Sequence, residues 1–260
     1  MDARRDDDVA LALRLADEAA SIALRHFAGG VTAETKGDGT PVTAADLDVE
    51  RRLVDRLQTE RPDDAILSEE AGRIGDGRRC WIIDPVDGTL NFVKGNDEWG
   101  THVALEDDGK VVLGVITRPA RRLRWWAARG LGAHREDRHD GTTTRLQVSK
   151  RDDLASSHVS VWSHQGDPVA GRLRAACVPV RPAIDNILQL VQGEIDAVAI
   201  IAGGMAEPWD HAPAVVLVTE ARGAFHDGHG GRRLDLGTGI STNQLLDGQL
   251  QAHLPDCRLS

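Results

Sequence analysis

The sequence predicts an α/β fold in which helices accompany a largely antiparallel sheet in the first part of the chain and alternate with strands in the second. Near the N-terminus, apolar residues recur with helical spacing. Short apolar segments bounded by Gly, Asp or Pro follow them, as is typical of hairpin strands. In the later part, strand-like and helix-like segments alternate. We therefore expect two halves, residues 1–145 and 146–260, in a chain long enough for a full-sized core.

The first half is expected to begin with two helices. The first is predicted by apolar residues three or four positions apart, before Gly29-Gly30, at Val9, Leu13, Ala16, Ala20, Ala23 and Phe27. The second is expected from Thr43 to near Leu57, since Thr43 and Asp46 have the spacing of a capping box. Strands are expected at AILS (65–68), CWIID (80–84), THVALE (101–106), VVLGVIT (111–117) and LRWWAA (123–128), and a surface loop at HREDRHDGTTT (134–144).

The second half is expected to alternate. We expect a strand at HVSVW (158–162), a helix at ILQLVQG (187–193), a strand at DAVAII (196–201), a helix at HAPAVVLVTEARG (211–223), and a strand then a helix within ISTNQLLDGQLQAHL (240–254). Pro213 is expected in the first turn of its helix, where a missing N–H is tolerated.

Composition narrows the function classes. The formal net charge is −10 and there is no basic block, so neither nucleic acid nor an acidic membrane surface is an expected partner. No apolar run approaches the roughly 18–20 residues of a membrane span. The acidic N-terminus is unlike a secretory signal, and the three cysteines are odd in number and far apart. These features predict a cytoplasmic protein.

Acidic residues stand at the ends of two predicted strands and at one helix start. Glu69 and Glu70 follow AILS, Asp84 and Asp87 close WIIDPVD, and Asp210 begins the segment before Pro213. Carboxylates brought together repel each other unless they hold cations. Oxygen ligands of this kind suit Mg²⁺, which is bound by a few carboxylates together with substrate phosphate.

Gly88 and Thr89 add groups that bind anions. A glycine directly after Asp87 permits a tight turn with exposed N–H groups, and a helix beginning there would add the positive end of its dipole. The segment therefore predicts a site where carboxylates hold metal and the metal, with backbone donors, holds a phosphate.

Each acidic residue also has a simpler interpretation. Asp84 before Pro85 is typical of a turn, Asp46 and Asp210 could serve only as helix caps, and Glu69-Glu70 could be a solvated strand end. GxxxxGK[ST], GxSxG and HExxH are absent, and the ten histidines show no metal-ligand spacing.

The chain resembles the inositol monophosphatase family, which comprises Mg²⁺-dependent, lithium-sensitive phosphomonoesterases. SEE, WIIDPVDGTLNF and PWDHAPAVVLVTEARG are similar to its signature segments, and KGDGTPVTAAD and WWAARGLGA extend the similarity over nearly the whole chain. The resemblance implies a layered α-β-α-β-α sandwich and a homodimer.

The resemblance also implies roles for individual residues. Two or three Mg²⁺ per active site would be bound by Glu69, Asp84, the carbonyl of Val86, Asp87 and Asp210. The substrate phosphate would be bound at Asp87, Gly88 and Thr89. The attacking water would be oriented by Glu69 and by Thr89, hydrogen-bonded to Asp46, and Glu70 would act through water.

Two departures from the family pattern bear on the substrate. Ser68 stands where the family usually has glycine before its two glutamates. Gly203 stands where inositol- and histidinol-phosphate enzymes often place a carboxylate that contacts the alcohol, so Asp185 and Glu207 become candidates for substrate binding beside Asp210.

The expected reaction is hydrolysis of a small-molecule phosphate monoester. WWAARGLGA is similar to actinobacterial histidinol-phosphate phosphatases of the family, which favours histidinol phosphate as the substrate. The alternatives are inositol 1-phosphate or another cyclitol, aminocyclitol or sugar phosphate. From another class, the alternative is a catalytically silent scaffold that binds phosphates.

Overall fold

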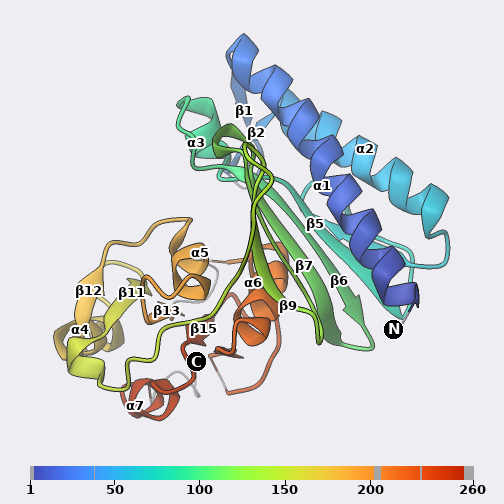
Figure 1. Cartoon of the computed structure of the whole chain (residues 1–260). Coiled ribbons are helices and arrows are strands. Elements are labelled where there is room, and N and C mark those ends of the chain that lie inside the picture. The colour runs from blue at the N-terminus through green and yellow to red at the C-terminus, as the bar shows by residue number, and fades with distance from the viewer. Residues whose placement is uncertain (1–2, 38, 202–205, 229, 255–260) are drawn as a thin grey trace.

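The computed structural model describes residues 3–37, 39–201, 206–228 and 230–254. They form five layers, shown in Figure 1 from helices α1 and α2 at the upper right to α4 and α7 at the lower left. Two helices cover the outer face of a large sheet, two lie between that sheet and a smaller one, and two cover the far face of the smaller sheet. The α-β-α-β-α sandwich predicted from the resemblance is confirmed.

The helices are assigned to these layers in order. They are α1 (Ala3–Gly29) and α2 (Ala44–Glu60) outside the large sheet, the short α3 (Thr89–Val93) at its edge, α5 (Asn186–Val191) and α6 (Pro208–Glu220) in the middle layer, α4 (Pro168–Ala176) and α7 (Asp247–Ala252) outside the smaller sheet, and two 3₁₀ turns at Pro119–Arg121 and Leu154–Ser156.

The large sheet has eight strands in the order β10-β9-β8-β7-β6-β5-β3-β4. Their bounds are β3 (Ala65–Ser68), β4 (Gly72–Ile74), β5 (Arg79–Asp87), β6 (Gly100–Asp107), β7 (Lys110–Arg118), β8 (Leu123–Ala128), β9 (Gly132–Asp137) and β10 (Thr143–Arg145). β3 and β5 pair in parallel and the other neighbours are antiparallel, as the run of hairpin-like segments predicts.

The smaller sheet has five strands in the order β12-β11-β13-β15-β14. Their bounds are β11 (His158–Trp162), β12 (Val178–Val180), β13 (Ala197–Ile200), β14 (Ala224–His226) and β15 (Gly239–Thr242), and a separate hairpin joins β1 (Ala33–Thr35) to β2 (Pro41–Thr43). β13 is apolar on both faces, with Ala197 and Ala199 in the outer core and Val198 in the middle one, because helices cover both sides.

The first helix is confirmed, but its buried face differs from the predicted one. Leu11 and Leu15 are fully buried against the sheet, whereas Val9, Leu13 and Phe27 are only partly buried at the edge of that core. The predicted apolar residues therefore lie along one side of the core-facing stripe.

The prediction of a loop at 134–144 is wrong. β9 pairs with β8 and with β10, so most of this stretch belongs to an antiparallel hairpin at the sheet edge. Its side chains are polar because edge strands stay close to water. Glu136, for example, accepts from Arg124 of the neighbouring strand (2.5 Å). The alternation of apolar residues that indicates a strand is therefore missing here.

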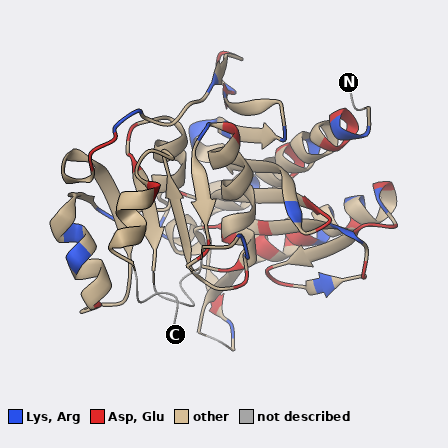
Figure 2. Ribbon diagram, turned by 90° about the horizontal axis from the view of Figure 1, so that it is seen from below, with Lys and Arg blue, Asp and Glu red and all other residues tan. Residues whose placement is uncertain are grey.

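Charge is mixed along the fold. Acidic and basic residues are interspersed, for example on the helix nearest the N-terminus in Figure 2, where Asp6 follows Arg4 and Arg5. Among the described residues, none of the helices combines the length and the apolar character that crossing a bilayer requires.

Candidate active site

The predicted acidic residues meet where β3 and β5 end. These strands are parallel with Ser68 beside Ile83, so the chain leaves both at the same edge. The pairing of β5 with β6 shifts register between Asp84 and Asp87, and Pro85, which lacks an N–H, lies within this bulge. Residues three apart face opposite sides of a regular strand. The bulge therefore lets Asp84 and Asp87 face the same space.

The turn after Asp87 requires glycine. Gly88 has a φ of 80°, in the left-handed region, and precedes the first turn of α3. A Cβ at this position would lie 2.7 Å from Ile184 Cδ1 and 2.8 Å from the Glu98 carbonyl oxygen. Both conformation and space therefore exclude a side chain. The helix predicted to begin after Gly88 is confirmed.

Thr89 connects this turn to the start of α2. Its hydroxyl donates to the Val86 carbonyl (3.0 Å) and lies 3.5 Å from Asp46 Oδ1, the outer limit of a hydrogen bond. Asp46 is held in the predicted capping box, since its Oδ2 accepts from the Thr43 N–H (2.8 Å) and hydroxyl (2.5 Å). Burial raises the pKa of Asp46, although the bonds from Thr43 oppose the change.

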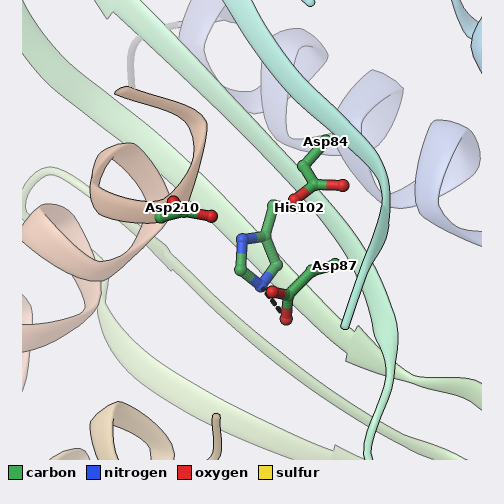
Figure 3. A group of neighbouring side chains, drawn as sticks. All are labelled: Asp84, Asp87, His102 and Asp210. Atoms are coloured by element: carbon green, nitrogen blue, oxygen red, sulfur yellow. Dashed lines mark ion pairs between the residues drawn. The ribbon is translucent and has the colours of Figure 1, made fainter. Parts of the chain in front are cut away.

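Three aspartates and one histidine form a compact cluster, drawn in Figure 3. Asp84, Asp87, Asp210 and His102 each offer a ligand atom, and these atoms all lie within 4.8 Å of one another. Asp84 and Asp87 come from β5, His102 from β6 and Asp210 from α6. Residues distant in sequence thus converge between the large sheet and the middle helices.

The carboxylates of this cluster are held in different states. Burial, and then the charges of Glu69 and Asp87, raise the pKa of Asp84 well above its usual range. Burial and the charge of Asp87 likewise raise the pKa of Asp210 to about 7. Burial also disfavours the charged form of Asp87, but His102 and Arg118 outweigh it and lower the pKa of Asp87. Without a cation, the cluster favours one charged and two protonated carboxyls.

Glu69 and Glu70 lie next to this cluster and are neutralised separately. Lys36 Nζ lies 3.0 Å from Glu69 Oε1 and 2.7 Å from Glu70 Oε1. The bonds to Glu70 and Glu69 raise the pKa of Lys36 against the effect of burial, so its charge is secure. Glu50 of α2 fixes the turn by accepting from the Glu70 N–H (3.2 Å) and from the Ser68 hydroxyl. Glu69 is thereby placed beside Asp84, although it is not a member of the four-residue group.

Asp210 is not an N-cap, and Pro213 is not in the first turn. The N-cap of α6 is Glu207, with Pro208 first in the helix and Asp210 at the third position. The backbone N–H of Glu207 donates to Asp210 Oδ2 (2.7 Å). Pro213 lies inside the helix, which begins three residues earlier than the segment predicted from residue 211. The interpretation of Asp210 as a cap is therefore wrong in position, but its carboxylate does support the helix start.

A cavity of about 620 Å³ opens beside the cluster. Its lining includes Asp87, Gly88, His102 and Asp210 together with side chains of the middle helix layer and the smaller sheet. This is the size of a small-molecule site, and the cluster lies at its wall.

The candidate substrate-binding residues lie in different settings. Asp185 is held by Arg118 Nε (2.7 Å) and Arg121 Nη1 (2.5 Å), and it does not line the described cavity. Glu207 is exposed at the start of α6. Gly203, the position of the missing carboxylate, lies outside the described residues. Substrate contacts by Asp185 and Glu207 stay predictions.

Three basic residues of the site were not predicted: Lys36, His102 and Arg118. A signal was present for His102, which pairs in register with Asp84 across β5 and β6 and interrupts an otherwise apolar strand. The search for histidines with regular spacing missed it because the neighbouring strand, not the sequence, brings it to the cluster. Arg118 is 1% exposed and binds Asp185 and Asp87, which nothing in the local sequence indicates.

The cluster fits a divalent cation. Asp84 Oδ1 and Asp87 Oδ2 are buried, and no described residue makes a well-aligned hydrogen bond to either. Such unsatisfied oxygens destabilise a protein unless something binds them. Three carboxylates around one space, with two of them protonated in the absence of metal, are a donor set that a divalent ion would deprotonate and satisfy.

Comparison with known proteins agrees with the geometry. The model of the inositol monophosphatase family matches residues 5–258. A Streptomyces griseus protein named glucose-1-phosphate thymidylyltransferase is 42% identical over 88% of this chain and 89% of its own length. The histidinol-phosphatase of Mycobacterium tuberculosis is 36% identical over 95% of this chain and 98% of its own.

Solved structures agree as well. An inositol monophosphatase from Zymomonas mobilis is 29% identical, covers 95% of this chain and 98% of its own, and superposes with a TM-score of 0.81.

Proposed function

Since the chain belongs to the inositol monophosphatase family, we propose that it is a Mg²⁺-dependent phosphatase that hydrolyses a small-molecule phosphate monoester, with histidinol phosphate as the favoured substrate. The observation that carries the proposal is the cluster of Asp84, Asp87 and Asp210 at the wall of the cavity, directly beside the Gly88 turn. Metal ligands and phosphate-binding N–H groups are thus neighbours.

The proposed roles follow the geometry. Asp84, Asp87 and Asp210 hold Mg²⁺, joined by Glu69 and the Val86 carbonyl. When bound, Mg²⁺ lowers the pKa of water and stabilises negative charge on the reacting oxygens. The N–H groups of Gly88 and Thr89 bind the phosphate, whose charge of about −1.5 to −2 the carboxylates alone would repel.

Thr89 and Glu69 are proposed to orient the attacking water. The Thr89 hydroxyl is fixed between the Val86 carbonyl and Asp46, so it is held in one orientation at the phosphate-binding turn. Glu69 is held by Lys36 on one side and lies near Asp84 on the other. A carboxylate and a hydroxyl fixed in this way can position one water for in-line attack.

The cavity supports an amino alcohol as the leaving group. Trp162 provides an aromatic wall and Glu98 a carboxylate, and both line the cavity with Asp87. An aromatic face suits the imidazole of histidinol and a carboxylate suits its ammonium group. The similarity to histidinol-phosphatases supports the same substrate.

Three alternatives are retained. Relatives named inositol-1-monophosphatase, 31% identical over 81% of this chain, support inositol 1-phosphate or another cyclitol or sugar phosphate. The printed name of the 42%-identical relative denotes nucleotidyl transfer to a sugar phosphate, which also needs a metal site. A catalytically silent phosphate-binding scaffold is the alternative from another class.

A substrate panel with Mg²⁺ tests the proposal. Phosphate release would be measured from histidinol phosphate, inositol 1-phosphate, fructose 1,6-bisphosphate and adenosine bisphosphate, and pyrophosphate release from dTTP with glucose 1-phosphate. We expect the highest kcat/KM for histidinol phosphate. Glu98→Gln should raise KM for histidinol phosphate and leave KM for inositol 1-phosphate unchanged. Release of pyrophosphate alone would favour the transferase, and no release from any compound would favour the scaffold.

The resemblance adds three further proposals. We expect inhibition by lithium at the Asp210 side of the site, a homodimer by light scattering, and a cytoplasmic location.

A further inference from the structure

His102 is directed into the carboxylate cluster from a neighbouring strand. It lies on β6 opposite Asp84 of β5, and its side chain is 7% exposed. In Figure 3 its ring lies between Asp84, Asp87 and Asp210 rather than beside them. Its position is therefore that of a member of the cluster.

The far nitrogen of the ring fixes its orientation. His102 Nδ1 lies 3.3 Å from the carbonyl oxygen of Trp209, the residue before Asp210. When Nδ1–H donates to this carbonyl, the lone pair of the neutral ring is on Nε2. Metal-binding histidines almost always donate their second ring N–H to a carbonyl or carboxylate, which sets the tautomer and the ring orientation. The start of α6 thus supplies one cluster carboxylate and orients His102.

The near nitrogen faces atoms that lack hydrogen bonds. His102 Nε2 is 3.0 Å from Asp87 Oδ2, but the two are not aligned as a hydrogen bond, and neither has another such partner among the described residues. Asp84 Oδ1 is in the same condition. Three buried polar atoms therefore point into one space, and a single cation could bind all of them.

We propose that His102 Nε2 is a direct ligand of the divalent ion bound by Asp87 and Asp210, and that this nitrogen makes the site favour a transition metal such as Mn²⁺ over Mg²⁺. Imidazole nitrogen suits first-row transition ions, whereas Mg²⁺ prefers oxygen ligands and retained waters. The inference rests on the proposed function only for the presence of a metal at this site.

A purely electrostatic role for His102 is the competing interpretation. In that case the ring would only neutralise Asp87. Arg118 already does this, with Nη2 3.3 Å from the same Asp87 Oδ2 and a second ion pair to Asp185. A second cation on one oxygen would add little, so the electrostatic role leaves the direction of His102 Nε2 unexplained.

The test is direct spectroscopy of bound Mn²⁺. The purified protein, freed of metal with a chelator, would be loaded with sub-stoichiometric Mn²⁺ and examined by pulsed EPR for modulation from a ligating ¹⁴N nucleus. We expect this modulation in the unchanged protein and its loss in His102→Leu. Mn²⁺ affinity by calorimetry should fall at least about tenfold in His102→Leu. Mg²⁺ affinity should change by less than about twofold.

His26→Leu is the matched control. His26 Nε2 also lies 3.0 Å from an aspartate oxygen, that of Asp48, but the pair joins α1 to α2 and is partly exposed. This variant should keep both the ¹⁴N modulation and the Mn²⁺ affinity. His102→Gln, which retains a polar side chain, provides a second test if the leucine variant does not fold.

Two results would overturn the proposal. One is Mn²⁺ bound to the unchanged protein without ¹⁴N modulation, and the other is Mn²⁺ and Mg²⁺ affinities that fall together in both His102 variants. Because binding is measured without substrate, either result can occur in an active phosphatase. The proposed function fails separately, on the substrate panel.

Discussion

Helices α2 and α6 begin in the same way, and both starts lie at the active site. Each has an aspartate at its third position that accepts a hydrogen bond from the N–H of the N-cap residue, Asp46 from Thr43 and Asp210 from Glu207. Burial raises the pKa of both carboxyls. The two residues therefore satisfy the same local requirement of a helix N-terminus.

The two starts differ in what the other side of each carboxylate meets. Asp46 faces Thr43 and the Thr89 hydroxyl, whereas Asp210 faces two further carboxylates and His102. The pKa of Asp210 reaches about 7 because the charge of Asp87 adds to burial. A capping role and a metal-binding role are thus compatible in one carboxylate. Only the tertiary neighbours decide whether the second role exists.

The largest expected effect is on catalysis by Asp210→Asn. Asparagine keeps an oxygen to accept from Glu207, so the helix start is preserved, but a negative charge leaves the metal cluster. We expect turnover to fall on the order of a thousandfold, equivalent to about 4 kcal/mol. The Mg²⁺ concentration for half-maximal rate should rise, and lithium inhibition should weaken.

A Mg²⁺ titration of the rate, with the melting temperature measured in chelator, checks this prediction. A metal-free melting temperature no lower than that of the unchanged protein would show that the loss is not structural. A normal titration curve would return Asp210 to a capping role alone and remove the contrast with Asp46.

The next effect is on the pH dependence of stability without metal. The folded-state pKa of Asp210, about 7, lies above its usual value of 3.8. The folded protein therefore keeps a proton that the unfolded chain releases. This contribution is complete below about pH 4 and is lost as pH rises through about 7, amounting to a few kcal/mol. Saturating Mg²⁺ should reverse the trend, since metal binding requires the ionised form.

Urea unfolding in chelator between pH 4 and 8 measures this effect. Other carboxylates contribute slopes of their own, so the informative quantity is the difference between the unchanged protein and Asp210→Asn. The variant should lose less stability over this range. Identical slopes would contradict the assigned state of Asp210.

The sequence predicted those parts of the site that lie together along the chain. Asp84, Asp87 and Gly88 occupy one segment, where a strand end and a tight turn have recognisable residues, and Thr43 with Asp46 is a local capping pattern. The fold class followed from similarly local periodicity. His102 and Arg118 escaped because their contacts depend on strand register and on a bulge at Pro85, which no local pattern specifies.

Asp46→Asn should have a smaller catalytic effect than Asp210→Asn. The amide can still accept from Thr43, but it binds the Thr89 hydroxyl less strongly than a carboxylate does. We expect kcat to fall about tenfold, or about 1.4 kcal/mol. The Mg²⁺ titration should not shift, because Asp46 is outside the metal-binding group. Steady-state rates over a Mg²⁺ series decide this, and a shift as large as that of Asp210→Asn would place both aspartates at the metal.

The smallest effects concern the N-cap side chains themselves, where the two starts should differ again. Thr43 Oγ1 accepts from the Ala45 N–H (3.1 Å) and donates to Asp46 Oδ2 (2.5 Å). Its replacement in Thr43→Ala should reduce the free energy of unfolding by about 1 kcal/mol. Glu207 is exposed, so Glu207→Ala should change stability by less than about 0.5 kcal/mol. Urea unfolding of both variants measures the difference. Equal losses would mean that the Glu207 side chain caps α6 as Thr43 caps α2. The two helix starts would then differ only in the neighbours of Asp46 and Asp210.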